Sequence, residues 1–144
     1  MTRIKLYFED VQEGNQIPSF TVENLTRTDI VRYAGSSGDF NPIHHDQGFA
    51  ETSGNPTVFA MGMMNAGILS RLVSDYAGVE NLRKYKVRFA TRVWPGDSIT
   101  CTGKVTKKAL ENGENIIEGD VAALNQKGEV AITGSFRAAL PSRA

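Results

Sequence analysis

The longest apolar segment of the chain predicts a helix over residues 62–76. Four of its side chains repeat at every fourth position along one face: Met64, Ile68, Leu72 and Tyr76. The first half of this helix carries no charge, so we expect the helix to be largely buried rather than amphipathic. Gly62 and Gly67 disfavour a helix, which suggests that another backbone or a ligand approaches closely at these positions.

Alternation of apolar and polar residues predicts strands in the second half of the chain. The expected strands cover residues 82–93, 98–108, 115–125 and 129–140. Residues 111–114 (ENGE) are a strong signal for a tight hairpin, and hairpins produce antiparallel sheets. In the first half, residues 17–24 have an extended pattern and residues 4–9 are expected to form an extended lead-in. Together these elements indicate an α+β protein with a curved antiparallel sheet of five or more strands around one long helix.

Two shorter helices are predicted before the long one. The first covers about residues 28–35 and has two candidate N-caps, Thr28 and Thr26, the latter in a capping box with Asp29. Its inward side chains are expected to be Ile30, Val31 and Ala34. Asp46 can cap the second short helix in the same way.

The composition fits one domain that spans residues 1–144. Apolar residues make up 40% of the chain, and 16 Lys and Arg balance 16 Asp and Glu. This balance argues against binding to nucleic acid or an anionic membrane through bulk charge. The chain shows neither a membrane-spanning stretch nor the long apolar run of a signal peptide, so we expect a cytoplasmic protein. The single cysteine, Cys101, excludes an intrachain disulfide and is expected to be a small buried hydrophobe.

Residues 38–46 (GDFNPIHHD) hold the candidate chemistry. The residue before Pro42 is pushed out of the helical region, so Asp39 and His44 cannot be neighbours on a helix face. The chain must curl between them, and a curl can point both side chains at one water molecule. Asn41 is expected to brace this curl through hydrogen bonds from its side chain to the backbone.

Residues 33–44 (YAGSSGDFNPIH) resemble the signature of the MaoC-like hydratases, which comprise (R)-specific enoyl-CoA hydratases and (3R)-hydroxyacyl dehydratases. The resemblance continues at residues 62–63 (GM), 87–89 (VRF) and 95–97 (PGD), so it covers most of the chain. It implies a hot-dog fold, in which an antiparallel sheet wraps around a central helix, and a homodimer with sites near the subunit interface. The implied reaction is reversible syn hydration of a trans-2-enoyl thioester to the (R)-3-hydroxyacyl thioester in fatty-acid metabolism. The thioester carrier would be coenzyme A or acyl carrier protein, and we expect no cofactor.

The resemblance also assigns roles by motif position. Asp39 and His44 match the family's catalytic pair, and we favour Asp39 as the main base, with His44 orienting the water. Gly62 matches the glycine whose amide N–H binds the thioester carbonyl, a role that suits the free N–H groups and positive dipole end of a helix start. Ser70 aligns loosely with a substrate-binding serine of some members. Many members have histidine immediately before the helix glycine, whereas this chain has Met61.

Two other functions are considered for the same residues. The hot-dog architecture also supports thioester hydrolysis, so a thioesterase is one alternative. A non-catalytic subunit that stabilises an active homologue is the other, and an intact Asp39 and His44 argue against it. His44, His45 and Asp46 are consecutive and lack a further histidine, so we expect no metal site. Three methionines at the start of the long helix are expected in the core: Met61, Met63 and Met64.

Overall fold

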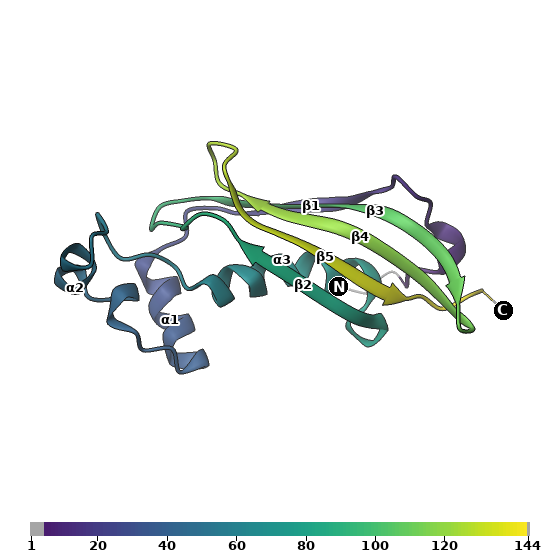
Figure 1. The fold of residues 1–144 in the computed structure, drawn as a ribbon, viewed down its shortest axis with the longest axis horizontal. Coiled ribbons are helices and arrows are strands. Elements are labelled where there is room, and N and C mark those ends of the chain that lie inside the picture. Colours follow the sequence, from purple (N-terminus) through teal and green to yellow (C-terminus); the bar gives the residue numbers. More distant parts are fainter. Residues whose placement is uncertain (1–4, 144) are drawn as a thin grey trace.

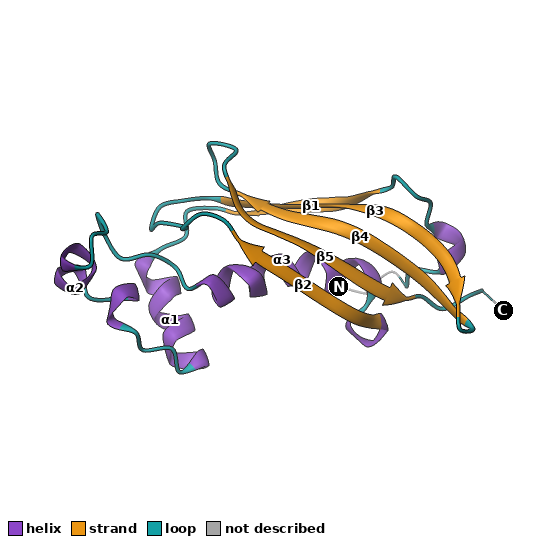
Figure 2. Ribbon diagram, in the orientation of Figure 1, coloured by secondary structure: helices purple, strands orange, loops and turns teal. Residues whose placement is uncertain are grey.

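A five-stranded antiparallel sheet curves over one long helix (Figure 1, Figure 2). The computed structural model describes residues 5–143. The strands are β1 (Gln16–Val22), β2 (Leu82–Phe89), β3 (Ile99–Glu111), β4 (Glu114–Leu124) and β5 (Val130–Ala139). Their order across the sheet is β1-β3-β4-β5-β2, and every neighbouring pair is antiparallel. The long helix α3 (Gly62–Ala77) lies under the sheet, so the predicted α+β hot-dog arrangement is confirmed.

The shorter helices gather mainly beyond one end of the sheet, at the left of Figure 1. They are η1 (Phe8–Asp10), α1 (Arg27–Ser37), η2 (Pro42–His44), α2 (Gln47–Thr52) and η3 (Val79–Asn81), of which α1 and α2 lie at this end. The capping box that starts α1 is confirmed, because the Thr26 hydroxyl accepts from the Asp29 N–H while the Asp29 carboxylate accepts from the Thr26 N–H. Thr28 therefore lies inside the helix and is not its cap.

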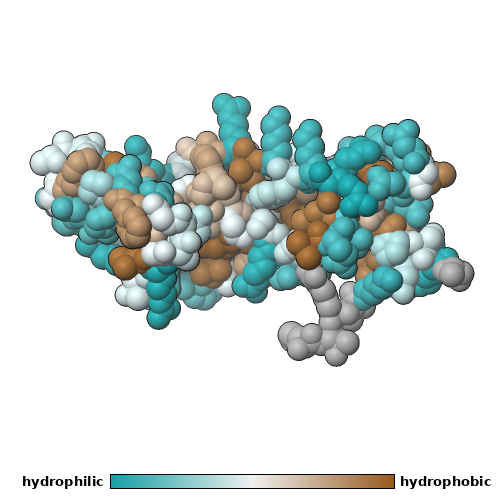
Figure 3. Space-filling view, turned by 90° about the horizontal axis from the view of Figure 1, so that it is seen from below, coloured by the Kyte–Doolittle hydropathy of each residue, from teal (hydrophilic) through white to brown (hydrophobic). Residues whose placement is uncertain are grey.

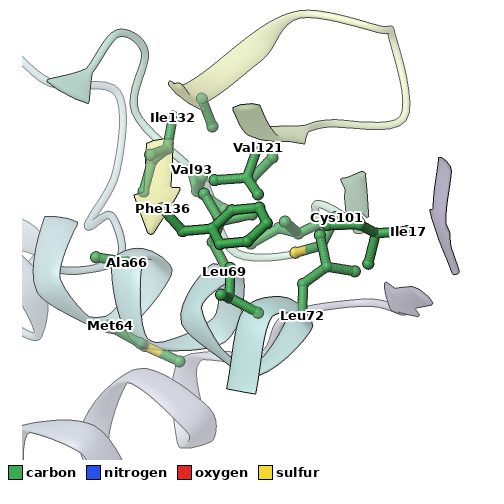
Figure 4. Close-up of a cluster of buried hydrophobic side chains, with 14 of the residues drawn as sticks. Ile17, Met64, Ala66, Leu69, Leu72, Val93, Cys101, Val121, Ile132 and Phe136 are labelled. Carbon is green, nitrogen blue, oxygen red and sulfur yellow. The ribbon is translucent and has the colours of Figure 1, made fainter. Parts of the chain in front are cut away.

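The core lies between α3 and the inner face of the sheet. Figure 4 shows Leu69 and Leu72 of α3 directed toward Phe136, Val121 and Cys101 of the strands. The side chains of this cluster are almost fully buried. Cys101 is completely buried, as predicted, and burial raises the pKa of its thiol to about 11. A thiol of this kind contributes to packing rather than to chemistry.

Two side chains predicted to face inward lie on the surface. Val31 is 54% exposed because α1 buries only a narrow stripe that contains Ile30 and Ala34. Met63 is 63% exposed because it lies on the side of α3 that faces away from the sheet, one turn before the exposed Gly67. A Cβ built at Gly67 meets no atom of the described chain within 4 Å, so close approach of another segment of this chain does not explain this glycine, and approach of a ligand stays a prediction.

Two predicted extended segments also differ from the structure. The lead-in over residues 4–9 contains the start of the 3₁₀ helix η1, and residue 4 lies outside the described residues. The strand predicted for residues 82–93 ends at Phe89, where the regular ladder with β5 stops and the amides of Ala90 and Thr91 both turn to the carbonyl of Ala131. The carbonyl of Val93 instead accepts a hydrogen bond of 2.9 Å from the amide of Ala60, which lies just before α3. This hydrogen bond places the segment that follows β2 beside the start of the central helix.

The face of the molecule opposite the sheet is not uniformly polar. In Figure 3, which views this side from below, apolar side chains form separate patches among hydrophilic ones. Among the described residues, no helix combines the length and apolar character that crossing a membrane requires.

Candidate active site

The segment between α1 and η2 forms the curl that the proline predicted. Gly38 ends α1 in the left-handed conformation, with φ of 75°, and its amide donates to the carbonyl of Ala34. The backbone of Asn41 is extended, with ψ of 122°, as expected before a proline. The Asn41 side chain accepts a hydrogen bond of 3.1 Å from the amide of Ile43, so it braces the turn that carries His44.

His44 is held in one orientation by the chain just before α3. Its Nδ1 lies 2.7 Å from the carbonyl oxygen of Phe59, and its ring meets the Phe59 ring edge to face at 5.1 Å. A carbonyl oxygen can only accept a hydrogen bond, so Nδ1 must carry the proton. The Nε2 atom of the neutral ring is then an acceptor, and it points toward Asp39.

Asp39 and His44 lie close together but do not form a direct hydrogen bond. The distance from Asp39 Oδ2 to His44 Nε2 is 4.0 Å. The Asp39 side chain is 43% exposed while that of His44 is only 10% exposed, so the gap opens toward solvent on the carboxylate side. Two acceptors that share one donor molecule through hydrogen bonds of about 2.8 Å lie roughly 4–4.5 Å apart. The gap therefore has the width for one water molecule that donates to both atoms.

The other half of the candidate site is the N-terminus of α3. Gly62 is the first helical residue, and no hydrogen bond to its amide N–H is found within residues 5–143. Met61 is the N-cap and makes no capping hydrogen bond, and its side chain is buried in the core. Met61 thus leaves the first amides of the helix without a side-chain cap. Free amides at a helix start attract negative charge.

A cavity of about 570 Å³ adjoins this helix start. Its walls include Phe59, Ala60, Gly62, Phe89, Trp94 and Ile132. Phe59 belongs to this wall and also carries the carbonyl that holds His44, so only three positions along the chain separate that carbonyl from Gly62. Arg92 lies at the same cavity, with its guanidinium 5.0 Å from the centre of the Phe59 ring. The cavity therefore has aromatic and aliphatic walls that alternate with polar side chains, namely those of Asn65, Thr91, Arg92 and Glu129.

Gly62 has a packing role as well as a favourable position. A Cβ at this residue would lie 3.1 Å from the ring of Phe89, the last residue of β2. The absence of a side chain thus allows the ring of Phe89, at the end of the edge strand, to pack against the helix start.

Ser70 lies two turns farther along α3 and is occupied locally. Its hydroxyl donates to the carbonyl of Gly67 at 2.8 Å, and the residues that line the Gly62 cavity do not include it. Its assignment to substrate binding stays a prediction. The structure adds Phe59, Trp94 and Asn65, which the sequence reasoning missed. Of these, only Asn65 gave a signal, as an amide within an otherwise apolar half-helix.

The chain is similar to known proteins over most of its length. Residues 11–127 match the family model described as the MaoC like domain. An (R)-specific enoyl-CoA hydratase of Rhodospirillum rubrum is 30% identical over 135 residues, which cover 82% of this chain and 90% of that protein. A Mycobacterium tuberculosis 3-oxo-4,17-pregnadiene-20-carboxyl-CoA hydratase beta subunit is 32% identical over 103 residues, which cover 71% and 77% of the two chains.

A solved structure supports the same fold. The (R)-hydratase from A. caviae involved in PHA biosynthesis superposes with a TM-score of 0.80 and 25% identity, covering 92% of this chain and 99% of that one. The chain also matches two much longer yeast proteins, of whose lengths it spans 12% and 6%.

Proposed function

Because the chain belongs to the MaoC-like domain family, we propose that it adds water reversibly to trans-2-enoyl thioesters and yields (R)-3-hydroxyacyl thioesters in fatty-acid metabolism. The observation that carries this proposal is the 4.0 Å gap between Asp39 Oδ2 and His44 Nε2, together with the Phe59 carbonyl that holds His44 three positions before the uncapped helix start at Gly62. The (R)-specific enoyl-CoA hydratase of Rhodospirillum rubrum and the (R)-hydratase from A. caviae support the reaction class.

In this proposal one water molecule donates its two hydrogens to Asp39 and to His44. Its oxygen then presents a lone pair to C3 of the enoyl thioester, and Asp39 accepts a proton as the oxygen–carbon bond forms. The pair returns a proton to C2 on the same face, which gives syn addition, and the carboxylate is ionised again at the end. The Nδ1–H group of His44 stays hydrogen-bonded to the Phe59 carbonyl throughout. The Nε2 atom is therefore available to orient the water and to help transfer the proton.

The amide of Gly62 would hold the thioester carbonyl. As water adds at C3, negative charge moves to the carbonyl oxygen, and an amide at the positive end of α3 stabilises that charge. The uncapped start of the helix supports this role, because the N–H of Gly62 has no competing acceptor within the described chain. Phe89, Trp94 and the other apolar walls of the cavity would limit access of bulk water.

The partners belong to the same proposal. The substrate is an acyl thioester of coenzyme A or acyl carrier protein, and the assembly is a homodimer in the cytoplasm. Strand β2 supports the dimer, because it is an edge strand that pairs without interruption from Lys84 to Phe89 on one side, while Phe89 and Met63 are more than half exposed. The opposite edge strand, β1, carries Pro18 and an irregular register, which disfavour pairing.

The test is a hydration assay with the purified chain and crotonyl-CoA, with longer enoyl-CoA substrates in parallel. We expect loss of the enoyl thioester absorbance without release of free thiol, and an (R) product on chiral analysis. Thiol release would identify a thioesterase instead, and an (S) product would contradict the proposed stereochemistry. Inactivity of the chain alone, with activity restored by a homologous subunit, would support the non-catalytic alternative.

A further inference from the structure

Asn65 is a polar side chain buried in the first turns of α3. The residue is 3% exposed, and its Oδ1 is the buried side-chain atom for which no hydrogen-bond partner is found among residues 5–143. An unpaired buried acceptor usually costs the free energy of removing it from water. Such a group is retained where it has another use, so its surroundings are informative.

The unpaired amide lies beside the amide of Gly62. Asn65 follows Gly62 by three positions, which places the two residues on the same face of the helix. Side chains on a helix lean toward its N-terminus, so that of Asn65 extends back toward Gly62. Both residues line the same cavity of about 570 Å³.

The other polar side chains of this cavity are exposed to solvent, and two of them also have hydrogen-bond partners. The Thr91 hydroxyl donates to the carbonyl of Val130, and the Glu129 carboxylate accepts from the side chain of Asn125. The guanidinium of Arg92 lies over the Phe59 ring. Asn65 is therefore the buried side chain whose hydrogen bonding a bound molecule would complete. Because its unpaired atom, Oδ1, is an acceptor, the molecule must offer a hydrogen-bond donor.

We propose that Asn65 Oδ1 accepts a hydrogen bond from the first amide N–H of the thioester carrier. This inference rests on the proposed function and adds a substrate-contacting residue to it. In coenzyme A and in acyl carrier protein alike, the sulfur and two methylene groups separate the thioester carbonyl from that amide. With the carbonyl on the N–H of Gly62, the amide falls within reach of a residue one helical turn away. Asn65 thus selects thioesters whose carrier has the amide, whichever of the two carriers is used.

The test compares two small crotonyl thioesters with the full-length chain. One is the N-acetylcysteamine thioester, which has the amide, and the other is the analogue in which a methylene group replaces that N–H. Replacement of Asn65 by leucine of similar shape, Asn65→Leu, should lower kcat/KM for the amide thioester by about 3- to 10-fold, the usual range for one neutral hydrogen bond. The same variant should leave kcat/KM for the methylene analogue unchanged.

Thermal unfolding provides the control for a merely structural role. Since leucine removes an unpaired acceptor and fills the same space, the melting temperature should not fall. Asn65→Ala, which also removes the acceptor, serves as the second variant if leucine prevents folding, and it should show the same preference.

The possible results separate the two proposals. An equal loss of kcat/KM with both thioesters, or no loss with either, overturns the role of Asn65. The second result is expected if a water molecule, rather than the substrate, donates the hydrogen bond to Asn65 Oδ1. Absence of turnover by the unmodified chain with crotonyl-CoA overturns the proposed function and this inference with it.

Discussion

The Nδ1 atom of His44 donates a hydrogen bond of 2.7 Å to the backbone carbonyl of Phe59. This contact joins the curl after α1 to the segment that leads into α3. It fixes which nitrogen carries the proton, since the carbonyl cannot donate. The Nε2 lone pair of the buried His44 therefore points toward Asp39. In this orientation the histidine can accept a hydrogen bond from a water molecule and orient it.

The tautomer of His44 can be measured directly. We expect neutral His44 to carry its proton on Nδ1, because the Phe59 carbonyl stabilises that form. The ¹⁵N chemical shifts of the imidazole nitrogens report the tautomer. The chain has only two histidines, so the variant His45→Gln leaves a single imidazole, with its two nitrogen signals, to assign. A ring protonated on Nε2 would contradict the proposed orientation of the water.

The catalytic pair should be sensitive to removal of either partner. Asp39→Asn and His44→Ala should each lower kcat for crotonyl-CoA hydration by about 10²–10⁴-fold, the usual contribution of a positioned acid or base. Asp120→Asn makes the same chemical change at an exposed residue of β4 and should leave kcat unchanged. Near-normal turnover in both Asp39→Asn and His44→Ala would rule out the proposed mechanism, provided that circular dichroism shows folded proteins.

The amide of Gly62 can be removed without removing the helix. Proline lacks an N–H but is well accepted at the first helical position, and the extended backbone of Met61 suits a following proline. Gly62→Pro should therefore lower kcat by about 10²–10³-fold relative to Gly62→Ala, as loss of one oxyanion donor does elsewhere. Gly62→Ala is the matched control because it brings the same Cβ against Phe89, at 3.1 Å, and keeps the N–H. Equal kcat values for the two variants would show that the amide takes no part.

An ion-pair cluster on the sheet should make stability depend on acid pH. The carboxylate of Glu111 accepts from Lys107 at 2.7 Å and from Arg137 at 2.6 Å. These hydrogen bonds lower its pKa from 4.5 to about 2. A carboxyl with a lowered pKa in the folded state stabilises the fold above its unfolded-state pKa, and this contribution is lost as the pH falls through the folded-state pKa.

Denaturant unfolding of Glu111→Gln tests this dependence. The variant should unfold at a lower denaturant concentration than the unmodified chain at pH 7. The difference between the two midpoints should shrink as the pH falls from about 4.5 toward about 2. A midpoint difference that stays constant over this range would show that the hydrogen bonds of Glu111 do not persist in solution.

Local chemistry in the sequence determined most of the elements and the candidate pair. Apolar residues at every fourth position predicted α3. The capping box of Thr26 and Asp29 supplied one of the two predicted starts of α1, the one that the structure confirms. The proline after Asn41 predicted the curl that brings Asp39 near His44. Each of these features depends on residues only a few positions apart, so propensity and spacing are sufficient to infer them.

Tertiary structure alone decided the contacts between distant segments. The sequence gives no indication that His44 would bond to a carbonyl fifteen positions away, or that β2 would end at Phe89 while Val93 pairs with Ala60. The exposure of Met63 and the unpaired oxygen of Asn65 likewise follow from which face of α3 the sheet covers. A helical repeat in the sequence shows which face of a helix is apolar. Whether the residues that flank this face are also buried depends on the path of the rest of the chain, because packing brings together residues that are far apart in the sequence.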